Sequence, residues 1–256
     1  MSNPFGISNP ELGRRLDFVR SLVAKKHPVD DPEPSLIAEG LFIGNKHHAA
    51  DVGQLCRLGI TVVLNCAPSG IRALPLDDYE AKGIRYAVTN VKRDDTSYPL
   101  LHDRAGVRSA HLDVAKEVFD AARRAGGRAM FFCVAGQNRS ATLAVAALLL
   151  CDQPLPKVLH SCAARRPFVL ENEGFQRQVV ELEALLLAQQ PRGRFPQANV
   201  QGEKRLMCSG DYIADQPTPN KKPRTVCGLE TTVEEVGRLL IGSVGRTVEA
   251  EQAFGF

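Results

Sequence analysis

A cysteine and an arginine six positions apart carry the strongest chemical signal in this sequence. The stretch FFCVAGQNRSATLAVAALLL places Cys133 after one apolar run and puts Arg139 and Ser140 just before another. Residues 133–139, called here the Cys133 loop, therefore lie between a predicted buried strand and a predicted buried helix. Backbone N–H groups at a helix N-terminus bind anions, and Gly136 permits the loop conformation that such a site requires.

The residue types in this loop suit chemistry on a phosphate group. Arg139 offers a planar, permanently charged fork that matches two phosphate oxygens. The positive surroundings favour the thiolate form of Cys133, and a thiolate facing a bound phosphate is a nucleophile for displacement at phosphorus. Ser140 can donate a hydrogen bond to the sulfur when it leaves. A single cysteine is usually a packing residue, but its spacing to Arg139 favours the chemical role.

The hydrophobic pattern predicts the framework that positions this loop. Short apolar runs of strand type alternate with amphipathic helical segments, which indicates an α/β fold with a central, mostly parallel sheet flanked by helices on both faces. The expected strands lie in LIAEGLFIGN (as a pair), GITVVLNCA, GIRYAVTNV and RAMFFCVA, and the expected helices span residues 9–26, 47–58, 109–125, 139–151, 156–164 and 173–187.

Composition divides the chain into three parts. Residues 1–33 are expected to form an N-terminal helix and linker, residues 34–190 the α/β domain, and residues 191–256 a largely disordered, flexible C-terminal extension with one short helix at 231–241. The seven cysteines are scattered and form no CxxC pair, which predicts neither a disulfide framework nor a metal site.

Charge and hydropathy exclude several classes of partner. The formal net charge of +3 gives no case for nucleic acid, and the longest apolar run is too short for a membrane span. The N-terminus does not have the pattern of a signal peptide, so a cytoplasmic protein is expected. The basic stretch NKKPRT at 220–225 is a candidate nuclear-import patch, and a solvated tail segment is its simpler interpretation.

The loop CVAGQNRS is similar to the CxxGxxRS signature of the cysteine-dependent protein tyrosine phosphatase superfamily, and its surroundings resemble the atypical dual-specificity protein phosphatases. The segment IAEGLFIGNKHHAADVGQLCRLGITVVLNCA resembles that family's opening strands and helix, and AARRPFVLENEGFQRQVVELE resembles its closing segment. The resemblance implies hydrolysis of phosphotyrosine and phosphoserine or phosphothreonine in proteins through a cysteinyl-phosphate intermediate, with no metal and no cofactor.

The resemblance also implies a role for the residues of the Cys133 loop. Cys133 is the implied nucleophile, Arg139 the phosphate clamp, and Ser140 the group that assists departure of the thiolate. The implied phosphate-binding residues are Val134, Ala135, Gly136, Gln137, Asn138 and Arg139. At position 132 the family usually has a histidine that supports the loop, whereas this chain has Phe132. The absence of the histidine is expected to slow the enzyme.

A carboxylic acid must protonate the leaving oxygen, and the polar segment NVKRDDTSYP contains two candidates. Asp95, directly before Thr96, matches the family better, and Asp94 is the alternative. Cys66 ends VVLNCA, at a place where some lipid-phosphatase relatives have a cysteine that pairs with the nucleophile. A reversible Cys66–Cys133 disulfide is therefore a further hypothesis, with a buried strand cysteine as its simpler alternative.

Other activities stay open on the sequence alone. The loop has no lysine, unlike relatives that act on phosphoinositides, and it continues Arg-Ser-Ala where relatives that act on RNA 5′-phosphates have Arg-Thr-Gly. Phe132 supports a pseudophosphatase that binds phosphoproteins without turnover. The expected partner is a phosphoprotein substrate, with a signalling kinase among the candidates. The sequence indicates neither which phosphoprotein it is nor the oligomeric state.

Overall fold

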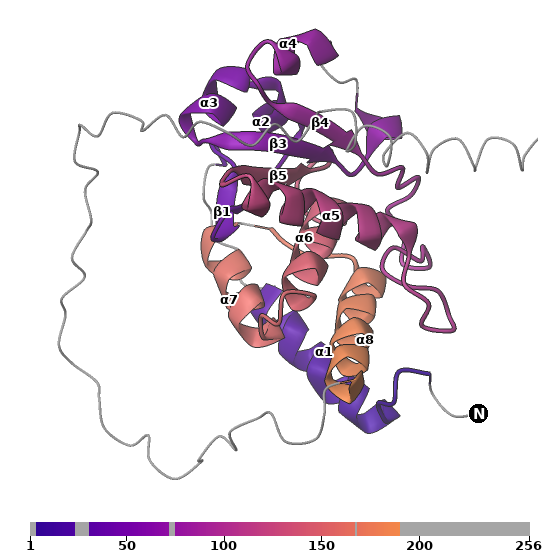
Figure 1. Cartoon of the computed structure of the whole chain (residues 1–256). Coiled ribbons are helices and arrows are strands. Elements are labelled where there is room, and N and C mark those ends of the chain that lie inside the picture. Colours follow the sequence, from indigo (N-terminus) through magenta and orange to yellow (C-terminus); the bar gives the residue numbers. More distant parts are fainter. Residues whose placement is uncertain (1–3, 24–30, 72–74, 167, 190–256) are drawn as a thin grey trace, which may run out of the picture. The chain divides into compact units, whose positions relative to one another are not determined.

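A five-stranded sheet forms the centre of the computed structural model, which describes residues 4–23, 31–71, 75–166 and 168–189 (Figure 1). β1 and β2 pair as an antiparallel hairpin, and the other neighbouring strands are parallel, which confirms the mostly parallel sheet. In the spatial order β1-β2-β5-β3-β4, the strands are β1 (Ser35–Ala38), β2 (Leu41–Gly44), β5 (Arg128–Phe132), β3 (Ile60–Asn65) and β4 (Arg85–Val88).

Helices cover both faces of the sheet, as the sequence predicts (Figure 1). One side carries α5 (Ala110–Arg124) and α6 (Arg139–Leu149), with α7 (Leu155–Arg165) and α8 (Glu173–Gln189) against α6, and α1 (Asn9–Val23) against α7 and α8. The other side carries α2 (Lys46–Ala50), α3 (Val52–Arg57) and α4 (Leu76–Glu80), and a 3-10 turn (Pro68–Gly70) follows β3. None of the helices in the described ranges has the length and apolarity needed to span a membrane.

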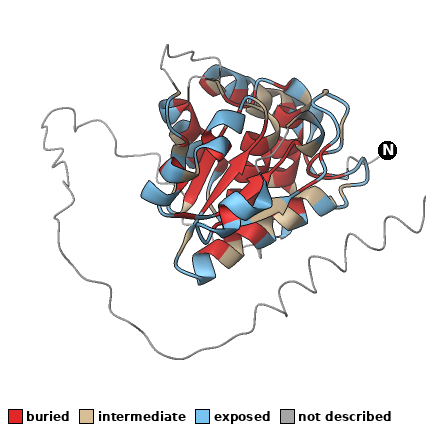
Figure 2. Cartoon of the chain, turned by 90° about the horizontal axis from the view of Figure 1, so that it is seen from above, coloured by how far each residue is buried: buried red, intermediate tan, exposed pale blue. Residues whose placement is uncertain are grey.

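Successive residues of the central strand β5 enter two different cores. Phe131 and Cys133 pack among α5, α6 and the helices around them, whereas Met130 and Phe132 pack toward α2, α3 and α4. This alternation follows from the two-residue period of a strand. Figure 2 shows buried residues on the strands and on the helices that cover them. Burial of both faces explains why these strands read as continuous apolar runs.

The structure corrects the single helix expected over residues 47–58. Two short helices, α2 and α3, meet there at Asp51, whose ψ of 79° lies outside the helical region. The Asp51 carboxylate accepts a hydrogen bond from the backbone N–H of Gln54 at 2.8 Å, so it begins a new helix. Helix α4 was not expected from the sequence. The predicted helix at 231–241, like the whole segment 191–256, lies outside the described residues.

Two glycines lead to opposite predictions for alanine substitution. A Cβ on Gly174, the second residue of α8, would overlap the backbone oxygen of Thr96, so Gly174→Ala should cost about 1–3 kcal/mol of unfolding free energy. A Cβ on Gly13 in α1 would have no neighbour within 4 Å, so Gly13→Ala should add about 0.5–1 kcal/mol. Urea unfolding of the two variants measures both effects. A Gly174→Ala variant as stable as Gly13→Ala would contradict the close approach of α8 to Thr96.

Candidate active site

The Cys133 loop joins the buried strand β5 to the buried helix α6, as the sequence predicts. Cys133 follows the last residue of β5, and Arg139 and Ser140 are the first two residues of α6. The hydroxyl of Ser140, which is fully buried, donates a hydrogen bond to Cys133 Sγ at 3.3 Å. The structure thus brings the thiol and the hydroxyl together, and this bond would stabilise negative charge on the sulfur.

The middle of the loop can be occupied only by glycine. Gly136 has a φ of +70°, in the left-handed region that other residues rarely adopt. A Cβ there would lie 2.6 Å from the backbone oxygen of Gly44 and 2.8 Å from Nη2 of Arg166. The turn of the loop at Gly136 therefore packs directly against β2 and the guanidinium group of Arg166.

Hydrogen bonds from two distant segments orient the backbone of the loop. The N–H of Lys46 donates to the carbonyl of Val134 at 3.3 Å, and the N–H of Leu170 donates to the carbonyl of Gln137 at 2.8 Å. In a trans peptide the carbonyl and the following N–H point in opposite directions. The two outward carbonyls therefore turn the next two N–H groups to the other side of the loop, as an anion site requires.

Arg139 is held by a carboxylate from the segment after β4. Its Nε lies 3.3 Å from Oδ2 of Asp94, and only 11% of its side chain is exposed. Within the described residues this Nε makes no hydrogen bond, so the contact is an ion pair without hydrogen-bond alignment. The side-chain amide of Asn172 donates to the other oxygen of Asp94 at 3.2 Å, and the Asn172 N–H donates to Oδ1 of Asn138 at 3.1 Å. Asp94 and Asn172 together connect Arg139 to the start of α8.

Asp95 lies on the same segment and has different partners. Its Oδ1 accepts hydrogen bonds from the hydroxyl and the backbone N–H of Ser97, at 2.7 and 3.0 Å. These two hydrogen bonds hold the pKa of Asp95 below its usual value, and the bond from the Ser97 hydroxyl has the larger effect. The structure thus brings Asp94, and not Asp95, to Arg139. The assignment of Asp95 as the general acid rests on its place before Thr96 and stays a prediction.

Phe132 is a core residue on the opposite side of the sheet from Cys133. It is 1% exposed, and its ring packs edge-on against Tyr86 with the ring centroids 6.2 Å apart. Tyr86 accepts a hydrogen bond from the side-chain amide of Asn65 at 2.7 Å. A phenyl ring has no hydrogen-bonding group, so any polar support of the loop must come from other residues.

Cys66 lies beside Cys133 at the ends of neighbouring strands. The parallel register pairs Asn65 with Phe132, so the two cysteines are the first residues after β3 and β5, and both are buried in the same core. Burial raises the pKa of the Cys66 thiol well above its usual value, and the nearby Cys133 raises it further. Both cysteines are free thiols in the structure.

Sequence reasoning missed two charged residues beside the loop. Arg166 is 2% exposed and donates to the carbonyl of Ile43 at 3.0 Å, and its Nη2 lies 3.0 Å from Oδ2 of Asp31. Arg166 belongs to the closing segment AARRPFVLENEGFQRQVVELE, and nothing in that segment singled it out from the neighbouring Arg165. Asp31 gave no signal because it belongs to a proline-rich linker.

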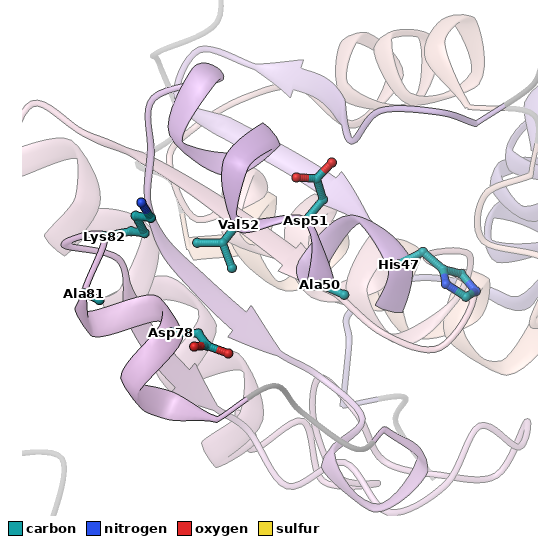
Figure 3. A pocket seen from close by; sticks show the side chains of 7 residues that line it. All are labelled: His47, Ala50, Asp51, Val52, Asp78, Ala81 and Lys82. Atoms are coloured by element: carbon teal, nitrogen blue, oxygen red, sulfur yellow. The ribbon is translucent and has the colours of Figure 1, made fainter.

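A separate pocket lies between helices α2 and α3 on one side and α4 on the other (Figure 3). Its volume is about 640 Å³, and it is lined by His47, Ala50, Asp51, Val52, Asp78, Ala81 and Lys82. None of these residues belongs to the Cys133 loop, and acidic and basic groups are mixed in its wall. In the described ranges no three histidine, cysteine or carboxylate side chains gather in a way that could hold a metal ion.

Comparison with known proteins identifies the family. The model of the dual specificity phosphatase catalytic domain matches residues 41–184. Dual specificity protein phosphatase 1 of Arabidopsis thaliana is 31% identical over 167 residues, which are 65% of this chain and 77% of that protein. Dual specificity protein phosphatase 26 of Homo sapiens is 32% identical over 149 residues, which are 57% of this chain and 65% of that protein.

Solved structures agree with this result. The crystal structure of human DUSP28 matches with a TM-score of 0.50 and 29% identity, over 60% of this chain and 98% of that one. The family match begins in β2, contains the whole Cys133 loop and ends in α8, which confirms the resemblance seen in the sequence. The chain therefore belongs to the dual-specificity phosphatases, as an atypical dual-specificity phosphatase of the protein tyrosine phosphatase superfamily.

Proposed function

We propose that this protein hydrolyses phosphotyrosine and phosphoserine or phosphothreonine in protein substrates, without a metal or a cofactor. The observation that carries the proposal is the buried hydrogen bond from Ser140, in the first turn of α6, to Cys133 at the start of the loop that ends at Arg139. Family membership indicates phosphatase-like activity of this class and favours neither phosphoinositides nor RNA 5′-phosphates as substrates. The proposed compartment is the cytoplasm or the nucleus.

In the first step the Cys133 thiolate attacks phosphorus. The S–P bond forms, the bond from phosphorus to the leaving oxygen breaks, and a carboxylic acid transfers its proton to that oxygen. Arg139 faces Asp94 through Nε, which leaves its two terminal amino groups to bind phosphate oxygens. The N–H groups of the loop and of the start of α6 add further donors to the equatorial oxygens.

In the second step water cleaves the cysteinyl phosphate. The carboxylate formed in the first step takes a proton from water, the new P–O bond forms, and the S–P bond breaks. The hydroxyl of Ser140 then donates to the departing sulfur, as it does in the structure. Inorganic phosphate leaves, and the thiolate is restored.

We assign the proton transfer to Asp95 and a supporting role to Asp94. Asp94 has one oxygen against Arg139 and the other on Asn172, which suits a residue that orients the arginine. Asp95 is held through Oδ1 by Ser97, so Oδ2 can be presented to a leaving oxygen. Because Gly174 has no side chain, the backbone at Thr96 can approach α8 closely.

The first experiment compares the purified protein with Cys133→Ser on para-nitrophenyl phosphate in the presence of a metal chelator. We expect Cys133→Ser to lose essentially all turnover, because oxygen is a much weaker nucleophile here than the thiolate. Arg139→Lys should lose at least about 10²-fold in kcat, since a lysine cannot form the bidentate contact. Phosphate release at the same rate from wild type and Cys133→Ser would refute the proposal and favour a pseudophosphatase.

The roles of Asp94 and Asp95 can be distinguished with two substrates whose leaving groups differ in their need for a proton. Asp95→Asn should lose about 10²-fold or more on a phosphoserine peptide and much less on para-nitrophenyl phosphate, whose phenolate leaves without help. Asp94→Asn should slow both substrates to a similar extent, because it acts through Arg139. The reverse pattern would assign the proton transfer to Asp94.

Ser97→Ala supplies an independent check through the pH profile. The Ser97 hydroxyl lowers the pKa of Asp95, so its removal should raise that pKa toward the usual value. An acid with a higher pKa stays protonated to a higher pH. The fall of kcat on the alkaline side of its pH profile should therefore move to higher pH. A limb that does not move would contradict the assignment to Asp95.

We also propose that peroxide joins Cys66 to Cys133. Hydrogen peroxide would oxidise the Cys133 thiolate to a sulfenic acid, and the Cys66 sulfur would then attack that sulfur and expel water. The adjacent places of the two residues support this pairing, whereas the raised pKa of Cys66 should make it slow. Mass spectrometry should find a loss of two hydrogens and a Cys66–Cys133 peptide, and Cys66→Ser should be inactivated irreversibly. An overoxidised Cys133 in wild type, with no such peptide, would rule the pairing out.

A further inference from the structure

Arg166 is a buried charge beneath the turn of the Cys133 loop. Its side chain is 1% exposed, and its Nη2 is the atom that a Cβ on Gly136 would approach to 2.8 Å. Its Nη1 donates to the backbone oxygen of Ile43 at 3.0 Å and to the hydroxyl of Ser35 at 3.3 Å. These contacts fix the guanidinium between β1, β2 and the loop.

Asp31 forms an ion pair with Arg166 and fixes its guanidinium further. Its Oδ2 lies 3.0 Å from Nη2 of Arg166 and also accepts a hydrogen bond from the side-chain amide of Asn45 at 3.3 Å. The backbone oxygen of Asp31 lies 2.7 Å from Nε2 of His48 in α2. Asp31 thus ties Arg166 to the beginning of α2, next to Lys46, whose N–H holds the loop carbonyl of Val134.

Stability alone does not explain a guanidinium in this position. A buried ion pair is often no more stabilising than apolar residues of the same size, because both ions lose their hydration. Among the described residues the Nε of Arg166 is buried without a hydrogen-bond partner, which adds a further cost. A costly charge that touches a proposed anion site is typical of a functional constraint.

We propose that Arg166, fixed by Asp31, is a positioning residue for the Cys133 loop, where it supports the Gly136 turn and adds positive potential beneath the bound phosphate. The inference rests on the proposed phosphatase function and adds to it a residue outside the loop. Electrostatic attraction is strong in this buried setting, whereas Asp31, at 22% side-chain exposure, is better screened by water. Arg166 thereby supplies polar support that Phe132 cannot give.

The test uses the full chain with Arg166→Met, Arg166→Lys and the matched control Arg165→Met. Arg165 is the exposed neighbour, and its Nη1 donates to the hydroxyl of Ser161 at 2.7 Å. Two properties are measured besides turnover: calorimetric binding of inorganic phosphate, and the pH midpoint for alkylation of Cys133 by iodoacetamide, followed on the Cys133 peptide. Circular dichroism confirms folding of each variant.

We expect Arg166→Met to weaken phosphate binding about tenfold, to move the alkylation midpoint to higher pH and to lower kcat by roughly 10- to 100-fold. Arg166→Lys should recover part of each loss, since lysine restores the positive charge but not the planar guanidinium with its several donors. Arg165→Met should match wild type. A folded Arg166→Met with wild-type phosphate affinity and an unchanged midpoint would overturn the inference.

Asp31→Asn keeps the inference testable if Arg166→Met does not fold. The loss of the carboxylate that fixes Arg166 should weaken phosphate binding by a few fold, and unchanged or tighter phosphate binding would then overturn the inference. The readouts also separate this inference from the proposed function. Phosphate binding that depends on Arg166 in a protein without Cys133-dependent turnover would refute only the phosphatase proposal. Wild-type turnover and binding in Arg166→Met would refute only the role of Arg166.

Discussion

The Cys133 loop depends on one constraint, which is that several of its carbonyl groups must face outward at the same time. A short loop cannot hold this conformation alone, because each peptide would otherwise turn to satisfy its own hydrogen bonds. Here the outward carbonyls of Val134 and Gln137 are held by N–H groups from other segments. The left-handed Gly136 lets the chain reverse between them. Strand, helix and flanking segments all serve to keep this backbone in place.

The hydrogen bonds that hold the loop carbonyls come from segments on its two sides. The residues that follow β2 hold one end, and the segment before α8 holds the other. Leu170 in that segment has a φ of +53°, an unfavourable conformation for leucine, and its N–H makes the bond to the loop. Local strain of this kind persists only where the surroundings impose it. The closing segment of the domain is therefore part of the candidate site as well as of the core.

Phe132, where the resemblance to the family implies a histidine, has a clear place in this architecture. The strand period sends position 132 to the core formed with α2, α3 and α4, and the thiol of Cys133 to the other face. The phenyl ring therefore adds apolar packing around Tyr86 and cannot hydrogen-bond the loop. The hydrogen bonds to the loop carbonyls come from the N–H groups of Lys46 and Leu170, which belong to the backbone and do not depend on residue 132.

The sequence by itself determined the sheet, most of its helices and the contiguous part of the site. Strand and helix periodicities are local, and Cys133, Gly136, Arg139 and Ser140 fall within eight consecutive positions, so their relation could be read directly. The prediction from the helical pattern was wrong at Asp51, where a side-chain cap begins a new helix and divides the one expected helix in two.

Only the tertiary structure decided which distant residues reach the loop. Asp94 meets Asn172 across 78 positions, and Asp31 meets Arg166 across 135. No periodicity or spacing encodes such pairs, because they form only when separate elements have packed. The sequence does not show which way two adjacent aspartates point, and in the structure Asp95 bonds the hydroxyl of Ser97 whereas Asp94 faces Arg139. Side-chain direction in a loop is set by its neighbours in space, and the sequence does not list those neighbours.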